Sequence, residues 1–210
     1  MRKFLAAVLV LVFASVSFAH PGKLDKNGGH FDKETGEYHY HKGPNALESL
    51  ELRRNTIYKA KVERVVDGDT AIVSFIFEDG SKYLKERVRF LGVDTPETVH
   101  PNKPVQFYGK EASDFTKAQL TDRIVWLQTD VNPKDRYDRM LAYVWMSEPD
   151  DKEIDDEKAI RAKMFNAKLL LEGYAQLMTI QPNSRYANLF VHFQREAREA
   201  NKGLWGKEPE

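Results

Sequence analysis

A series of short β-rich segments in the first half of the chain constrains its fold more than any other feature. Residues 57–66 and 71–77 are rich in β-forming side chains, and Asp67-Gly68-Asp69 lies between them as a tight turn. A second turn at residues 78–81 leads into residues 83–93, where apolar and charged side chains alternate. Three strands joined by such short turns predict an antiparallel meander.

After this meander the hydrophobic period becomes that of a helix. Apolar residues from Val105 to Phe115 recur at steps of three and four, so they share one helix face. The other elements expected are strands over residues 123–128 and 141–145 and helices over residues 166–172 and 186–200, the helices ending at Gly173 and Gly203. Five strands with a helix inserted after the third predict an α+β, mainly β fold, a five-stranded Greek-key barrel of the oligonucleotide/oligosaccharide-binding type packed against three helices. The same order of elements also fits an unrelated α+β fold.

The first 19 residues have the three-part layout of a secretory signal peptide. Arg2 and Lys3 precede an uncharged, mostly apolar run that ends at Ala19, and Ser17 and Ala19 are small residues at the positions that a signal peptidase reads. The alternative is an uncleaved membrane anchor, but the run is shorter than the roughly 20 residues of a spanning helix. We expect cleavage after Ala19 and a secreted or periplasmic protein that is not attached to a membrane.

Composition excludes several kinds of site. The chain has no cysteine, which excludes disulfides, thiolate metal sites and a cysteine nucleophile. Its 32 Lys and Arg residues balance 32 Asp and Glu residues, so the formal net charge is +0. Such a chain has no bulk positive field to capture nucleic acid from a distance, and any such binding must come from locally placed cations.

Four of the six histidines lie close to the expected mature N-terminus. They are His20, His30, His39 and His41. Tyr38 to His41 alternate tyrosine and histidine, so a strand here would place two imidazoles on one face. With His30 and His20 these imidazoles would form a second metal site for Zn²⁺ or Cu²⁺. The stretch resembles a small Tyr-His-Tyr-His module of exported bacterial proteins, and the alternative is a surface hairpin that binds no metal.

Charged residues at the ends of the expected strands suggest a second kind of chemistry. The meander would bring Asp69, at the start of its second strand, close to Asp94, at the end of its third. Two carboxylates with a main-chain carbonyl and water make an oxygen-only site suited to Ca²⁺ or Mg²⁺. Arg89 and Arg139 are fork-shaped donors that match phosphate oxygens, and the Glu97 carboxylate is able to orient or deprotonate water. Together these groups are what the hydrolysis of a phosphodiester requires.

Three ordered stretches make this pattern specific. They are residues 66–70 (Val-Asp-Gly-Asp-Thr), 87–97 (Arg-Val-Arg-Phe-Leu-Gly-Val-Asp-Thr-Pro-Glu) and 135–143 (Asp-Arg-Tyr-Asp-Arg-Met-Leu-Ala-Tyr). They resemble the staphylococcal nuclease (thermonuclease-like) family, and the likeness extends from about Tyr58 to Trp205. The divisions expected along the chain are therefore a signal peptide (1–19), a His-rich module (20–43), a linker (44–55), a nuclease domain (56–205) and a tail (206–210).

The resemblance implies a role for each matching residue. Asp69 and Asp94 would ligate Ca²⁺ by their carboxylates and Thr95 by its main-chain oxygen, Glu97 would orient or deprotonate the attacking water, Arg89 and Arg139 would bind the scissile phosphate, and Arg136 and Tyr137 would contact the substrate. The implied protein is a calcium-dependent endonuclease that cuts DNA, RNA or both to 3′-phosphate ends. We expect nucleic acid as its partner and a monomer as its state.

Two departures and two other functions stay open. Residues 177–182 lack the tyrosines with which family members often flank a base, and residues 147–158 hold seven acids that would repel substrate if they overhang the cleft. A barrel of this kind that binds nucleic acid without cutting it is the main alternative, since fold alone does not give activity. A metal-handling protein centred on the histidines is the other.

Overall fold

The computed structural model describes residues 29–31, 38–40, 52–77, 82–98 and 106–206. The chain forms two compact units, residues 1–46 and 47–210. The described part of the first unit is an antiparallel pair of strands, β1 (Gly29–Phe31) and β2 (Tyr38–Tyr40), in which His30 is opposite His39. The predicted signal peptide, His20 and His41 lie outside the described residues and stay predictions.

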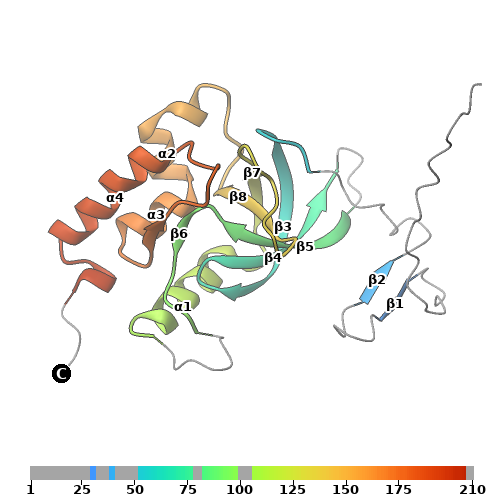
Figure 1. The fold of residues 1–210 in the computed structure, drawn as a ribbon, viewed down its shortest axis with the longest axis horizontal. Helices are drawn as coiled ribbons and strands as arrows, with labels where there is room; N and C mark the ends of the chain where they lie inside the picture. The colour runs from blue at the N-terminus through green and yellow to red at the C-terminus, as the bar shows by residue number, and fades with distance from the viewer. Residues whose placement is uncertain (1–28, 32–37, 41–51, 78–81, 99–105, 207–210) are drawn as a thin grey trace, which may run out of the picture. The chain divides into compact units, whose positions relative to one another are not determined.

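The second unit is built on a closed barrel of five strands (Figure 1). Its strands are β3 (Ile57–Asp67), β4 (Thr70–Ile76), β5 (Lys82–Phe90), β7 (Ile124–Gln128) and β8 (Met140–Trp145). Their order around the barrel is β3-β4-β5-β8-β7, with every pair antiparallel except β5 and β8, which are parallel. The predicted meander and the predicted five-stranded α+β barrel are both confirmed.

The described residues contain four α-helices, one more than the sequence predicts. They are α1 (Gly109–Leu120), α2 (Glu157–Lys163), α3 (Phe165–Leu171) and α4 (Ala187–Glu199), with 3₁₀ turns η1 (Glu153–Asp155) and η2 (Gly203–Trp205). The additional helix is α2, which begins in the acidic stretch. Asp156 caps it by accepting a hydrogen bond from the Ala159 N–H at 2.9 Å, and the extended backbone of Met164 separates it from α3. The sequence does not predict this helix, because it begins among acidic residues and buries little more than Ala159 and Ile160.

The predicted third strand is broken near its end. β5 ends at Phe90, and residues 92–94 form a separate strand, β6 (Gly92–Asp94), that pairs with β9 (Gln176–Met178). The break is at Gly92, whose φ of 76° is in the left-handed region. At this corner the chain leaves β5, and the Asp94 carboxylate that follows pairs with Arg89.

The core fills the barrel and continues between the barrel and the helices. Its largest fully buried side chains include Trp145, Tyr143, Phe90, Phe165 and Phe190. In Figure 1, α3 lies between the barrel and α4, in keeping with its contacts to both.

Two of the predicted helices differ in detail from the structure. The last helix buries Phe193 and Ala197, whereas Ala200, at the end of the predicted range, is exposed and lies just beyond α4. The first helix starts later than predicted, since Tyr108 has a left-handed backbone with φ 63°. None of the helices among the described residues is long and apolar enough to cross a membrane.

Candidate active site

The β3–β4 turn places one buried carboxylate beside the segment that follows β6. Asp69 accepts hydrogen bonds from the Thr70 hydroxyl at 2.9 Å and from the main-chain N–H of Thr95 at 3.0 Å. A Cβ atom at Gly68 would lie 2.6 Å from the Thr95 hydroxyl oxygen, so the two segments approach too closely for any other residue. The turn and the segment around Thr95 therefore hold each other in place.

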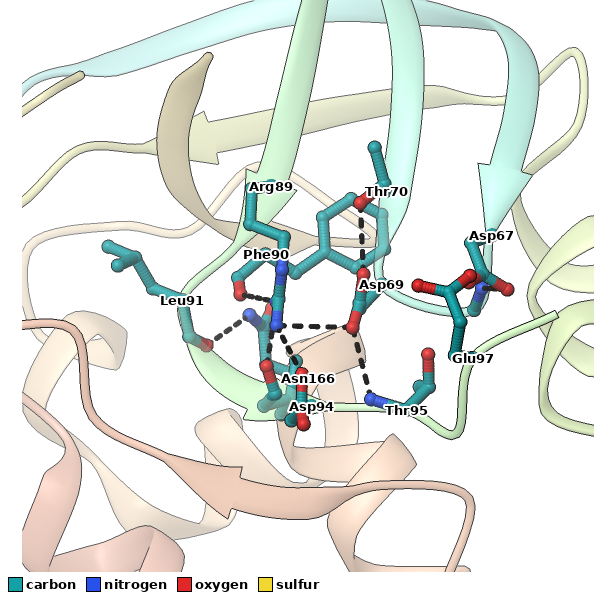
Figure 2. Close-up of polar contacts among 12 residues, drawn as sticks. Asp67, Asp69, Thr70, Arg89, Phe90, Leu91, Asp94, Thr95, Glu97 and Asn166 are labelled. Carbon is teal, nitrogen blue, oxygen red and sulfur yellow. Dashed lines mark hydrogen bonds and ion pairs between the residues drawn. The ribbon is translucent and has the colours of Figure 1, made fainter. Parts of the chain in front are cut away.

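Arg89 connects this turn to Asp94. Its side chain is 5% exposed, and Nη1 donates to the main-chain oxygens of Phe90 and Val93, each at 2.7 Å. Nη2 lies 2.8 Å from Asp94 Oδ1 and 3.2 Å from Asp69 Oδ2, as Figure 2 shows. A buried guanidinium is stable here because each of its terminal nitrogens has partners. Arg89 therefore brings the Asp69 and Asp94 carboxylates together at one point.

A cavity of about 230 Å³ opens beside this ion-pair group. It is lined by Val66, Asp67, Asp69, Thr70, Arg87, Arg89, Asp94, Thr95, Glu97 and Arg139. Six residues predicted for the nuclease site thus line one cavity, although they come from three separate stretches of sequence. Four carboxylates face three guanidiniums there, which leaves an excess of formal negative charge.

Arg139 reaches the cavity from the loop before β8. Its Nε donates to Asp135 Oδ2 at 2.7 Å, and its guanidinium lies 5.5 Å from the centre of the Tyr137 ring. Tyr137 is 64% exposed, and its hydroxyl accepts a hydrogen bond from Arg136 at 2.7 Å. Arg136 and Tyr137 are not among the residues that line the cavity, but they border it through Arg139.

Burial raises the pKa of two of these carboxyl groups above the ordinary value of an aspartate. For Asp67, burial outweighs the hydrogen bonds from Thr98 and from the Gly68 N–H. For Asp94, burial outweighs the attraction of Arg89, and nearby carboxylates raise the pKa further. The site is therefore crowded with negative charge that a bound cation would offset.

The donor atoms fit a hard cation better than a transition metal. The carboxylates of the cavity offer oxygen only, which suits Ca²⁺ or Mg²⁺. In the described part of the chain, no three Asp, Glu or His side chains come together closely enough to hold a metal ion by themselves. A cation bridging Asp69 and Asp94 would therefore need a main-chain oxygen, such as that of Thr95, and water to complete its coordination.

The sequence pattern did not single out several residues that shape this site. Asp67 accepts a hydrogen bond from Thr98 at 2.7 Å and is drawn beside Glu97 in Figure 2. Asn166, fully buried on α3, donates to the Leu91 oxygen at 2.8 Å and so fixes the end of β5. Asp67 was readable as part of the Asp-Gly-Asp turn, whereas the contact of Asn166 with a residue 75 positions earlier has no local signal.

The acidic stretch lies away from the cavity. Glu148 and Pro149 border a different hollow, together with Phe75 at the far end of β4 from Thr70. Farther along, Asp155 is paired with Arg185 at 2.9 Å. None of the acids in this stretch lines the carboxylate cavity.

The histidine site cannot be built from the described side chains. In the pair formed by β1 and β2, the main chain of His30 lies opposite that of His39. His20 and His41 lie outside the described residues. Metal binding by these histidines therefore stays a prediction.

Comparison with known proteins agrees with the resemblance seen in the sequence. A family model described as staphylococcal nuclease homologue matches residues 87–207. A thermonuclease of Staphylococcus intermedius is 43% identical over 163 residues, which cover 78% of this chain and 83% of that protein. A thermonuclease of Staphylococcus hyicus is 46% identical over 145 residues, covering 69% and 74%. Endonuclease YncB of Bacillus subtilis (strain 168) is 29% identical over 218 residues, covering 99% and 93%.

Proposed function

Because the chain belongs to the staphylococcal nuclease family, we propose that it is an exported, Ca²⁺-dependent endonuclease that hydrolyses DNA, RNA or both to 3′-phosphate ends. That it is a nuclease is supported by its thermonuclease and endonuclease relatives. Its dependence on calcium, its export and its 3′-phosphate products are proposed. The observation that carries it is the single cavity shared by Asp69, Arg89, Asp94, Glu97 and Arg139.

Asp69, Asp94 and the main-chain oxygen of Thr95 would hold the calcium ion. When bound, Ca²⁺ would supply Lewis-acid stabilisation of the negative charge that develops on a phosphate oxygen. The remaining chemistry belongs to the protein's own side chains. A bound cation would also relieve the repulsion among the crowded carboxylates.

The two guanidiniums would act on the phosphate. The transition state of phosphodiester hydrolysis carries more negative charge than the substrate, so donors fixed in advance stabilise it preferentially. Arg89 is such a donor, because its four contacts to protein oxygens hold it in one orientation. Arg139, held by Asp135, would bind a second oxygen.

Glu97 would orient or deprotonate the attacking water. It lines the cavity on the side of Asp67, and its main-chain N–H donates to the Gln106 side chain at 2.9 Å. Arg136 and Tyr137, at the border of the cavity, would contact a phosphate next to the cleaved bond.

The decisive experiment is digestion of plasmid DNA and of RNA by the mature protein. We expect cleavage with Ca²⁺, none with EDTA, and a loss of two or more orders of magnitude in kcat for Glu97→Gln, the usual scale for general acid–base catalysis. Glu111→Gln, at an exposed position on α1, is the matched control and should retain full activity. Removal of terminal phosphate from the products by a 3′-phosphatase tests the product end.

The alternative is a nucleic-acid-binding barrel that does not cut. It would bind a labelled oligonucleotide but leave it intact with Ca²⁺, and Glu97→Gln would change nothing. The presence of Arg89, Arg139 and Glu97 in the cavity favours the nuclease.

Export has its own test. The mature protein recovered from the periplasm or medium should begin at His20, and protein beginning at Met1 and retained in cells would contradict export. Metal analysis of this mature protein after incubation with Zn²⁺ or Cu²⁺ tests the histidine site.

A further inference from the structure

One arginine of the cavity has no role in the proposed chemistry. Arg87 lines the cavity two residues before Arg89 on β5 and is exposed. Arg89 is held in place by four protein oxygens, whereas Arg87 forms no ion pair with any residue that the structure describes. An exposed guanidinium beside a phosphate-binding cavity is available to a ligand.

The strand register shows that Arg87 is not isolated. Arg87 is the partner of Ile72 on β4, and Ile72 is in turn the partner of Arg64 on β3. In the next row Lys85 is the partner of Ser74 on β4. Cross-strand partners have their side chains on the same face of a sheet, so Arg64, Lys85 and Arg87 share one face.

That face is the outer face of the barrel, on the same side as Arg89. Arg89 is the partner of Thr70, one row before Ile72. The residues that alternate with these along the strands, such as Ala71, Val73 and Val88, are fully buried in the core. Alternate residues of a strand are roughly 7 Å apart, so Arg89, Arg87 and Lys85 form a line that leads outward from the cavity.

Three cations lie exposed on this line and beside it. Within the described part of the chain, Arg64, Lys85 and Arg87 make no ion pair, whereas Lys61 on the same face is held by Asp122 at 2.7 Å. In a protein with a formal net charge of +0, such cations are the local positive charge that polyanion binding needs.

We propose that Arg64, Lys85 and Arg87 form an outer-face track that binds the phosphodiester backbone of the substrate strand beyond the cleaved bond. The proposal rests on the nuclease function proposed above, because it assigns the path of the same substrate. Arginine and lysine bind phosphates without reading base sequence, so the track would increase affinity for long strands and leave the chemical step unchanged. Ile72 would contribute an apolar surface between Arg64 and Arg87.

The test compares two double variants that remove equal charge. Arg64→Gln with Lys85→Gln removes two track cations that do not line the cavity, and Lys152→Gln with Lys158→Gln removes two exposed lysines of the acidic stretch. Each is assayed on a dinucleotide, which contains only the cleaved phosphate, and on a 12-nucleotide single strand. Binding of the labelled 12-mer by the same variants carrying Glu97→Gln is measured at several salt concentrations.

The track variant should raise KM for the 12-mer on the order of tenfold and reduce the salt slope of its binding by about 0.7 per lost contact. Its kcat/KM for the dinucleotide should remain within twofold of the original protein, as should all values of the control variant. Arg87→Gln should weaken 12-mer binding in the same direction. The track would be overturned if both double variants changed KM and the salt slope for the 12-mer equally, or if neither variant changed them.

Failure of the track and failure of the nuclease are distinguishable. If the unaltered protein cuts neither substrate, the proposed function fails, and the binding series still decides on the track. If it cuts both but the salt slope is the same in both double variants, only the track fails. Thermal unfolding should be equal in the lysine and arginine variants because their altered side chains are exposed.

Discussion

Arg139 owes its orientation to one carboxylate. Asp135 accepts hydrogen bonds from the side chain and the main-chain N–H of Arg139 and from the main-chain N–H of Tyr137. Burial by itself would raise the pKa of Asp135, but these hydrogen bonds outweigh it and lower the pKa below its ordinary value. Asp135 is therefore a positioning residue whose ionised form stabilises the folded loop.

The lowered pKa gives a pH-dependent prediction. A carboxyl whose pKa is lower in the folded protein stabilises it above the unfolded-state pKa, about 3.9, and this contribution is lost as the pH falls through the folded-state pKa. Asp135→Asn should reduce the free energy of unfolding by about 1–2 kcal/mol at pH 7. Urea unfolding of both proteins at pH 7 and pH 3 should show the difference shrinking at low pH. A difference that does not depend on pH would contradict this role for the charge.

Gly68 is the residue whose replacement should separate the two halves of the site. A Cβ there would lie 2.6 Å from Thr95 Oγ1 and 2.8 Å from the Thr95 Cβ and Cγ2 atoms. Gly68→Ala should cost about 1–3 kcal/mol of stability and lower kcat/KM more than tenfold, because the segment carrying Asp94 and Glu97 must shift.

A second substitution tests this explanation. The Thr95 hydroxyl is buried with no hydrogen-bond partner among the described residues, so Thr95→Ala should be mild by itself. Combined with Gly68→Ala it removes two of the three clashing atoms and should recover part of the lost activity, measured as a double-mutant cycle. Simple additivity of the two changes would show that the clash is not the cause.

At the scale of elements, the sequence predicts best where local pattern and tertiary environment agree. Runs of β-forming residues located β3 and β4, and alternation located most of β5. It failed at residues 91–93, where alternation continues but the chain turns at Gly92. It also missed α2, whose start is made of acids that look like a solvated loop. Both failures occur where contacts with distant segments decide the backbone.

The Gly92 corner yields a prediction at this scale. Gly92→Ala would place a Cβ 2.5 Å from the ring of Phe190 on α4 and would keep a non-glycine residue at φ 76°. Strain and overpacking together should reduce the free energy of unfolding by about 2–4 kcal/mol. Gly206→Ala, where φ is −70° and the nearest contact is 3.2 Å, is the control and should cost much less. Equal loss in both variants by chemical denaturation would contradict the importance of the corner.

At the scale of the whole molecule, the site follows from the barrel's topology. The carboxylate at the β3–β4 turn and the one after β5 meet because consecutive antiparallel strands return to the same end of the barrel, which the sequence predicts from turn lengths alone. The approach of Arg139 depends on the parallel pairing of β5 with β8, in which Arg89 is opposite Leu141. No spacing in the sequence predicts that non-local pair. Arg139 was recognised as a candidate phosphate donor from its residue type and position, and the family resemblance assigned it to the site.

The boundary of the barrel unit is the last testable feature. Leu52 is buried against the core, and the Thr129 hydroxyl donates to the Arg53 oxygen at 2.7 Å while accepting from the Thr56 N–H at 3.0 Å. These contacts lie before the first barrel strand, within a stretch that the sequence predicts as a linker. A protein beginning at residue 47 should therefore unfold at the same denaturant concentration as the mature protein and keep its nuclease activity.

A protein beginning at residue 57 tests the other side of this boundary. It lacks Leu52 and the hydrogen bonds to Thr129, and should lose about 2–4 kcal/mol of stability, the usual cost of removing a buried leucine. Because every residue of the cavity is still present, its activity at low temperature should persist while its unfolding midpoint falls. If the two shortened proteins were equally stable, residues 52–56 would be a linker after all, and the barrel would begin at β3.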